Sequence, residues 1–257
     1  MYGQLPQPTI FAHRGSSAYA PENTLAAFEL AIRQNAHAIE LDAKLSSDGH
    51  VVVIHDASVD RTTDGEGKVA ELSLASLKSL DAGCKYDKSF CGEKIPTLEE
   101  VFETVGGKTF INVELTNYAT PKDNLPEKVA EIVRSTGMHD RVLFSSFNPF
   151  SLRRIHKLIP NIPIGLLALP RIAGAWARSF LGNWVHYDAL HPEVRDTNQR
   201  LIFRLQKRGH RVHTYTVNHP EDMEKFFKWG ISGIFTDDPP LAFRTLLHVQ
   251  EGKSKSA

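Results

Sequence analysis

Strand-like and helix-like runs alternate along almost the whole chain, and this alternation limits the possible folds more than any other feature. Apolar runs suited to strands occupy 9–12, 38–43, 109–115, 141–145, 162–167, 185–190, 211–217 and 231–236. Segments with helical apolar spacing separate most of them, as at Leu25, Phe28 and Ile32. About eight β/α units result, which is the number that closes a (β/α)₈ barrel. We therefore predict an α/β protein with a TIM-barrel fold.

The segment 48–96 interrupts this alternation. It contains one β-like run at 51–54 and is otherwise rich in Asp, Gly, Ser and Lys, so we expect a small inserted subregion near the barrel mouth. No Gly-, Ser- or Pro-rich linker divides the 257 residues. We therefore expect one domain over 1–257, with a disordered tail at 250–257.

Composition excludes several classes of protein. Thirty basic residues balance thirty acidic ones, so nucleic acid is not an expected partner. No apolar run reaches the ~18 residues that span a bilayer, and 1–8 lacks the features of a signal peptide. We expect a cytoplasmic protein without a stable membrane anchor. Cys84 and Cys91 could pair in an oxidising compartment, but two free thiols are the favoured interpretation. Monomer and homo-oligomer both stay open.

Polar side chains stand where most of the predicted strands end. In TIM barrels the active site lies at the carboxyl ends of the strands. A strand end in solvent would also be polar, which could explain one such residue but is a weak explanation for the set. We therefore expect the functional site among these positions, which are His13, Asp42, Glu114, Ser145, Ser146, His191, Tyr215 with Asn218, and Thr236 with Asp237.

Three acidic residues on two of these strands suggest a metal site. Glu40 and Asp42 are two residues apart on a strand, so both point to the same side. Burying two carboxylates side by side requires a compensating cation or proton. With Glu114 from the next barrel strand, they could supply oxygen ligands to one divalent cation. The alternative is a structural network with Arg or Lys; we favour the metal, because no basic partner is evident on the same faces nearby in the sequence.

Two histidines and an arginine complete the predicted site. His13 and His55 each end a β-like run, and side chains with a pKa of about 6.5 can divide general acid and base work near neutral pH. Arg14 offers a bidentate fork for phosphate, and Gly15 allows a close backbone approach. Together with the three acids, this pattern predicts a metal-assisted site for a phosphate ester.

Six stretches of the sequence carry a resemblance to a known family: AHRGSSAYAPENTLAAF (12–28), IELDAKLSSDGHVVVIHDASVDRTTDGEGKV (39–69), GEKIPTLEEV (92–101), INVEL (111–115), SSFNP (145–149) and TVN (216–218). On these stretches the chain resembles the glycerophosphodiester phosphodiesterases over nearly its whole length. The resemblance implies a TIM barrel with an insertion after the second-strand region. It also implies hydrolysis of glycerophosphodiesters to glycerol 3-phosphate and an alcohol, with Ca²⁺ or Mg²⁺ as cofactor.

The same resemblance implies a role for each matching residue. His13 and His55 would be the acid/base pair, and Arg14 would hold the phosphate. The substrate's own 2-hydroxyl would act as nucleophile, forming a cyclic phosphate that water then opens. The metal ligands would be Glu40, Asp42 and Glu114.

Two positions depart from the family pattern. Thr116 stands where many relatives carry Lys, so one positive charge is missing from the phosphate site or comes from elsewhere. Tyr215 stands where many carry Trp, at the wall facing the glycerol or the leaving group. We expect Thr116, Tyr215 and His191 to contact the substrate.

Other functions stay open. The segment 173–185 contains Trp176, Phe180 and Trp184, which could form a lip for an acyl chain and make the protein a lysophospholipase D. The favoured alternative is a helix packed on the barrel, with these rings in the core. A non-catalytic barrel that binds phosphodiesters is supported only by Thr116. A sugar-phosphate isomerase or aldolase is disfavoured, since no Gly-rich phosphate loop is evident near the last strands.

Overall fold

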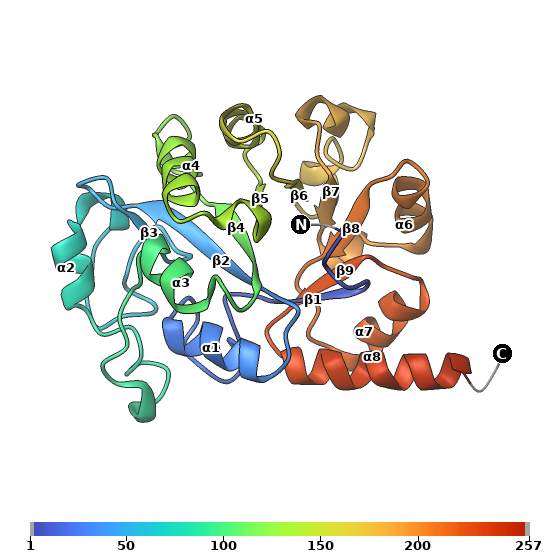
Figure 1. Ribbon diagram of the computed structural model, residues 1–257, viewed down its shortest axis with the longest axis horizontal. Coiled ribbons are helices and arrows are strands. Elements are labelled where there is room, and N and C mark those ends of the chain that lie inside the picture. Colours follow the sequence, from blue (N-terminus) through green and yellow to red (C-terminus); the bar gives the residue numbers. More distant parts are fainter. Residues whose placement is uncertain (1–2, 255–257) are drawn as a thin grey trace.

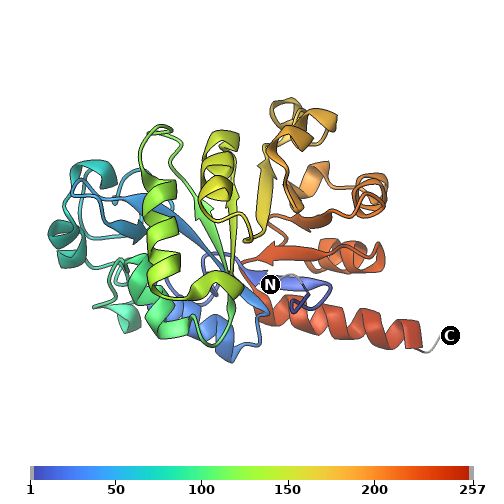
Figure 2. The same cartoon turned by 45° about the horizontal axis from the view of Figure 1, so that its top comes forward.

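Eight parallel strands close into a barrel in the computed structural model, which describes residues 3–254, with side chains through 252 (Figures 1 and 2). Their order around the barrel is β1-β2-β4-β5-β6-β7-β8-β9, and β9 pairs with β1. The TIM barrel predicted from the alternation is confirmed. The strands are β1 (Thr9–Ala12), β2 (Ala38–Leu45), β3 (Val51–Val53), β4 (Phe110–Leu115), β5 (Val142–Ser146), β6 (Ile164–Ala168), β7 (Ala189–Pro192), β8 (Arg211–Thr214) and β9 (Gly233–Thr236).

Helices surround the barrel, and local capping explains where several begin. Thr97 and Glu100 form a reciprocal capping box at the start of α3. Proline occupies the first turn of α4, α5 and α7, where its missing N–H has no intrahelical partner to lose. The helices around the barrel are α1 (Leu25–Arg33), α3 (Leu98–Val105), α4 (Leu125–Ser135), α5 (Pro149–Leu158), α6 (Gln199–Gln206), α7 (Pro220–Lys228) and α8 (Pro239–Ser254).

The carboxyl-terminal helix corrects one expectation. The tail predicted at 250–257 is helical as far as Ser254, because α8 continues to that residue; 255–257 lie outside the described residues. Within 3–254, no helix combines the length and the apolar character needed to cross a membrane.

The connection between β6 and β7 contains no α-helix. It carries two 3₁₀ helices, η4 (Arg171–Gly174) and η5 (Phe180–Val185), and the strand expected at 185–190 begins only at Ala189. Trp176 packs against the core, but Phe180 and Trp184 are 73% and 47% exposed. The predicted core helix is therefore wrong for this segment, in which glycines at 174 and 182 lower helix propensity.

The segment 48–96 packs around an apolar cluster of its own. Besides β3, which runs antiparallel to β2 outside the barrel, it contains η1 (Val69–Glu71), α2 (Leu74–Ser79) and η2 (Lys88–Phe90). Its cluster of buried side chains is Val52, Ile54, Val59, Val69, Leu77, Ala82 and Ile95.

A disulfide links Cys84 to Cys91 within this segment, so the interpretation of two free thiols is wrong. The Asp81 carboxylate accepts hydrogen bonds from the backbone N–H groups of Cys84 and Gly92. These bonds fold the loop back on itself and bring the two cysteine Cα atoms to 4.2 Å.

Large rings fill the interior of the barrel. Phe11 stacks on Phe235, and both contact His213. His191 from β7 lies over Gly165 of β6, where an added Cβ would come within 2.3 Å of the imidazole. Glycine is therefore the residue that lets an imidazole fit inside the barrel at this point.

Adding one methyl group at this contact tests the interior packing. We expect Gly165→Ala to lower the free energy of unfolding by about 1–3 kcal/mol, because the ring and the surrounding strands must shift. Gly107→Ala is the matched control, since an added Cβ there meets nothing within 4 Å. Urea denaturation of both variants measures the effect, and equal stability would contradict this account of the barrel interior.

Candidate active site

A cavity of about 230 Å³ opens at the carboxyl ends of the strands. The structure brings together there seven of the nine residues to which the sequence assigned a catalytic, metal-binding or substrate-binding role. Those seven are His13, Arg14, Glu40, Asp42, His55, Glu114 and Tyr215. The other lining residues are Asn112, Ser145, Phe147, Leu167, Thr216 and Phe235.

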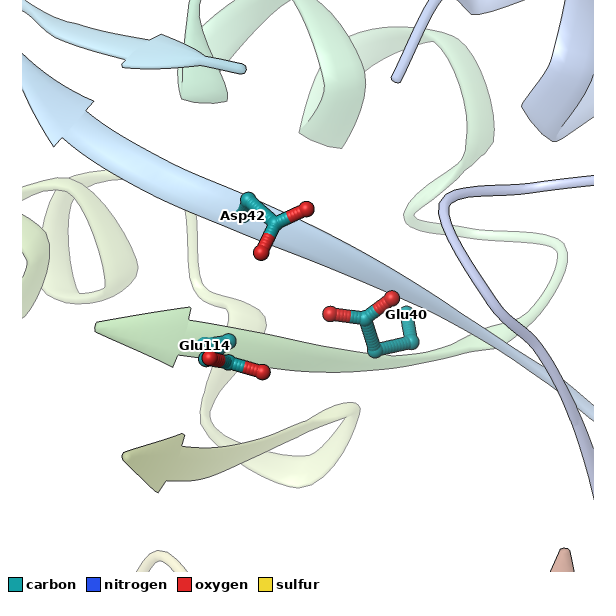
Figure 3. A group of neighbouring side chains, drawn as sticks. All are labelled: Glu40, Asp42 and Glu114. Carbon is teal, nitrogen blue, oxygen red and sulfur yellow. The ribbon is translucent and has the colours of Figure 1, made fainter. Parts of the chain in front are cut away.

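Three carboxylates converge in this cavity. Glu40 and Asp42 project from β2, and Glu114 projects from β4, where it is in register with Asp42 (Figure 3). One oxygen from each lies within 4.8 Å of the other two. Glu40 and Asp42 are only 2% exposed. The alternation of side chains along two neighbouring parallel strands is what places all three on the interior of the barrel.

Burial and mutual repulsion make this cluster favour a bound proton or cation. Burial first, and then the charges of Asp42 and Glu114, raise the pKa of Glu40 well above its ordinary value. Burial and Asp42 raise the pKa of Glu114 to about 8. The Glu40 Oε1 atom is buried and has no hydrogen-bond partner among the described residues. An oxygen-only set with an unpartnered buried oxygen fits a hard divalent cation.

Basic side chains do lie beside the acids, contrary to the sequence expectation. The Arg14 side-chain Nε lies 3.4 Å from Asp42 Oδ2, and the backbone N–H of the same residue donates to Glu40 Oε2 at 2.8 Å. Lys44 follows Asp42 on the same face of β2. Arg14 is shared with Glu22, however, and the Lys44 ammonium donates to the Thr116 oxygens. The three carboxylates are therefore only partly compensated, and Glu40 Oε1 still lacks a partner.

Each histidine in the cavity is held by a carboxylate. His13 Nδ1 lies 2.7 Å from Asp237 Oδ1, just beyond β9. His55 Nδ1 lies 2.6 Å from Asp56 Oδ1 in the inserted segment. A carboxylate at Nδ1 favours the tautomer with the proton on that nitrogen, which leaves Nε2 as the atom free to exchange a proton.

The two carboxylates are themselves fixed as anions. Hydrogen bonds from Arg61 and His55 lower the pKa of Asp56 to about 2. Burial opposes ionisation of Asp237, but bonds from His13, Asn218 and Ser17 keep its pKa below the ordinary value. Both histidines therefore face a permanent negative charge at neutral pH.

A chain of ion pairs connects the phosphate-binding candidate to the inserted segment. Arg14 Nη1 donates to Glu22 Oε1, and Arg61 donates to both oxygens of Glu22. Arg61 also donates to Asp56, which holds His55. Sequence reasoning missed Glu22 and Arg61, although both lie inside the stretches that carry the family resemblance. Their opposite charges lie 39 residues apart, so no local pattern pairs them.

Thr116 and His191 do not line the cavity, contrary to expectation. The Thr116 hydroxyl donates to the Ala43 carbonyl and accepts from Lys44, so it is turned away. His191 is fully buried behind Phe235, and burial lowers its pKa to about 3. It contacts His213 instead of solvent.

At Gly15 the backbone approaches a helix closely. Its φ is +83°, and an added Cβ would lie 2.7 Å from Ala27 of α1. The close approach that glycine permits is therefore to this helix.

A row of aromatic side chains runs from Glu114 to the cavity wall at Phe147 and Tyr215. Tyr118, which the sequence did not single out, donates its hydroxyl to Glu114 Oε1 at 2.7 Å. Its ring meets Phe147 edge-on, and Phe147 meets Tyr215 in the same way. Tyr215 donates its hydroxyl to the Ala168 carbonyl, so it presents its ring to the cavity.

Comparison with known proteins shows which family this chain resembles. The sequence model of the glycerophosphoryl diester phosphodiesterase family matches residues 13–241. A glycerophosphodiester phosphodiesterase from Caldanaerobacter subterraneus subsp. tengcongensis is 42% identical over 231 residues, which cover 90% of this chain and 94% of that protein. A second such enzyme, from Bacillus subtilis, is 33% identical, and the aligned region covers 90% of this chain and 83% of that protein.

Solved structures agree with the sequence comparison. A phosphodiesterase from Oleispira antarctica, solved with the product sn-glycerol-3-phosphate, superposes with a TM-score of 0.85 at 31% identity. The alignment covers 95% of this chain and 97% of that one. A glycerophosphodiester phosphodiesterase from Agrobacterium tumefaciens superposes with a TM-score of 0.79 at 29% identity, over 91% and 98% of the two chains.

Because the pKa of Glu114 is raised, replacing its carboxyl group should stabilise the folded protein, and the size of this gain should depend on pH. An unfolded glutamate has a pKa of about 4.3, so between that value and about 8 the folded protein holds the extra proton. Stability therefore falls as pH rises through this range. In excess chelator at pH 8 we expect the melting temperature of Glu114→Gln to exceed that of the wild type by about 2–4 °C or more. Near pH 4 the two melting temperatures should be equal.

Two comparisons isolate this effect in thermal melts. Glu66→Gln, at an exposed carboxylate, should leave the melting temperature unchanged at both pH values. Ca²⁺ or Mg²⁺ should stabilise the wild type at pH 8 and have little effect on Glu114→Gln. A wild type more stable than Glu114→Gln in chelator at pH 8 would contradict the proposed strain among the acids.

Proposed function

Because the chain belongs to the glycerophosphoryl diester phosphodiesterase family, we propose that it hydrolyses glycerophosphodiesters to sn-glycerol 3-phosphate and an alcohol. One observation supports this most strongly. The three converging carboxylates share a single cavity with two histidines, each tied to a carboxylate through Nδ1. The product complex of the Oleispira antarctica relative adds support from a similar fold.

In this proposal Glu40, Asp42 and Glu114 hold one divalent cation, Ca²⁺ or Mg²⁺. The bound cation supplies positive charge that stabilises the developing charge on phosphate oxygens. Arg14 adds guanidinium donors on the same side of the cavity, and Glu22 orients its side chain. The oxygen-only ligand set suits either cation.

His13 and His55 exchange protons with the substrate through Nε2. One histidine takes the proton from the glycerol 2-hydroxyl, whose oxygen attacks phosphorus. The other gives a proton to the departing alcohol oxygen as its bond to phosphorus breaks. A five-membered cyclic phosphate results, and both histidines have then changed protonation state. They are ready for the reverse roles when water opens the ring, and the enzyme returns to its starting form.

No protein hydroxyl is needed as nucleophile in this scheme. Ser145 lines the cavity, but its Oγ accepts a hydrogen bond from Asn112. The substrate's own hydroxyl is held on the molecule that reacts, so its attack needs no second bound reactant.

Two alternatives remain distinguishable. A lysophospholipase D, acting on glycerophosphodiesters that carry an acyl chain, is favoured by the exposed rings of Phe180 and Trp184. A non-catalytic phosphodiester-binding barrel is disfavoured, because the acids and both histidines are present and oriented, and Thr116 lies off the cavity.

Release of glycerol 3-phosphate from glycerophosphocholine tests the proposed activity. We expect turnover with Ca²⁺ or Mg²⁺ and its loss in excess chelator, because the acids then repel an anionic phosphate without compensation. Choline release from lysophosphatidylcholine, measured in parallel, tests the lysophospholipase D alternative. Absence of turnover of both substrates with either cation would contradict the proposal.

His13→Gln tests the role of the histidines. We expect kcat to fall by about 10²–10⁴-fold, the usual contribution of general acid–base catalysis. Glutamine keeps a polar side chain of similar length, so folding should be unaffected. His139→Gln, at an exposed histidine outside the cavity, is the matched control and should retain full activity. Equal kcat values in the two variants would exclude His13 as a proton-transfer group.

A further inference from the structure

Large apolar side chains are exposed where the β6–β7 connection meets the amino-terminal end of α5. We call this set the β6–β7 surface. Ile172 is 91% exposed and Phe180 is 73% exposed, which is unusual for side chains of this size within one connection. The connection projects at the rim of the barrel in both views (Figures 1 and 2). The set is Phe150, Leu169, Ile172, Phe180, Leu181 and Trp184.

Two residues of this surface follow closely in the sequence on residues that line the active-site cavity. Leu167 lines the cavity, and Leu169, two residues later, is 44% exposed. Phe147 also lines the cavity, and Phe150, three residues later, meets the Trp184 ring edge-on at 5.6 Å. Two chain segments therefore carry apolar side chains both in the cavity wall and in the β6–β7 surface.

Arginines border the same surface. The Arg153 guanidinium lies 4.3 Å above the Trp184 ring, and Arg171 is exposed beside Ile172. The segment 169–186 contains no Asp or Glu. The surface therefore combines apolar side chains with local positive charge, although the whole chain has a net charge of zero.

A second cavity of about 230 Å³ lies between this connection and α6. Arg178, Arg200 and Arg204 line it, together with one acidic residue, Asp196. Asp196 pairs with Arg178 at 3.1 Å, which leaves positive charge in excess. Guanidinium groups that converge on a small cavity suit a phosphate group.

We propose that the β6–β7 surface and this arginine cavity adsorb the protein reversibly to a phospholipid surface that carries anionic head groups. The apolar side chains enter the boundary between head groups and acyl chains, and the arginines contact lipid phosphates. Adsorption would bring the active-site cavity to the lipid. Its use in catalysis rests on the proposed function, but the adsorption itself does not.

The charge on this surface argues against a second copy of the chain as the occupant. In a two-fold symmetric dimer the same patch faces itself, which would bring the arginines of both copies together with few acids to offset them. An anionic lipid surface is complementary both to the apolar residues and to the arginines.

Vesicle flotation tests the proposal without relying on turnover. We expect wild-type protein to bind vesicles of phosphatidylcholine with phosphatidylglycerol, with a blue shift of tryptophan fluorescence, and to bind pure phosphatidylcholine more weakly. Raised salt should reduce binding. Ile172→Ser/Phe180→Ser should weaken binding to the anionic vesicles by about tenfold or more. Arg200→Ser should reduce the difference between the two vesicle types.

Leu247→Ser is the matched control. Leu247 is 44% exposed on α8, which lies along the opposite edge of the molecule from the β6–β7 connection in both views (Figures 1 and 2). This variant should bind vesicles like the wild type. Hydrolysis of a water-soluble diester should be unchanged in Ile172→Ser/Phe180→Ser, because neither residue lines the active-site cavity. That assay distinguishes a protein that lacks the proposed activity from one that does not bind lipid.

Three results would overturn the lipid-binding proposal. One is a wild type that binds neither vesicle at low salt. Another is equal vesicle binding by the wild type and the Ile172→Ser/Phe180→Ser variant. The third is a concentration-dependent dimer, seen by light scattering, that this variant abolishes while vesicles are not bound; the surface would then be an interface between copies.

Discussion

Repulsion among Glu40, Asp42 and Glu114 is the interaction on which the rest of the site depends. Oxygens within 4.8 Å of one another repel by roughly 3 kcal/mol or more for each ionised pair at an effective dielectric constant of about 20. The barrel tolerates this cluster only with a proton or a cation among the oxygens. A protein that needed only stability would place apolar side chains there, so the retained charge points to chemistry.

Charged residues around the three carboxylates pair with one another and do not neutralise these carboxylates. Arg14 is the closest guanidinium, but Glu22 shares its charge, and Arg61 in turn binds Glu22 and Asp56. This network joins the β1–α1 connection to the inserted segment. Through it, the orientation of the phosphate-binding candidate is coupled to that of His55. His13 is held separately, from the end of β9, so the two histidines rest on different parts of the fold.

The sequence was sufficient to predict those features that depend on the spacing of apolar and polar residues along strands and helices. Apolar runs predicted the barrel, and the two-residue spacing of Glu40 and Asp42 predicted their common direction. The same reasoning failed for Thr116, because β4 ends at Leu115 and the hydroxyl then bonds to Ala43. It failed for His191 because a strand-end residue can also point inward, where Gly165 on the neighbouring strand leaves room.

Other features depend on contacts between distant segments. The pairing of Cys84 with Cys91 follows from hydrogen bonds made by Asp81, and no spacing rule predicts them. The exposure of Phe180 and Trp184 follows from the absence of an α-helix between β6 and β7, whereas the sequence suggested a buried helical stripe.

Calorimetric titration of the metal-free protein with Ca²⁺ and Mg²⁺ is the most direct test of the central claim, that the three carboxylates form a cation site. Titration at pH 7 in two buffers of different ionisation enthalpy also measures released protons. A cation site at these carboxylates predicts one ion per chain, net proton release because Glu40 and Glu114 have raised pKa values, and loss of binding in Glu40→Gln. Absence of binding by either cation, or undiminished binding in Glu40→Gln, would contradict it.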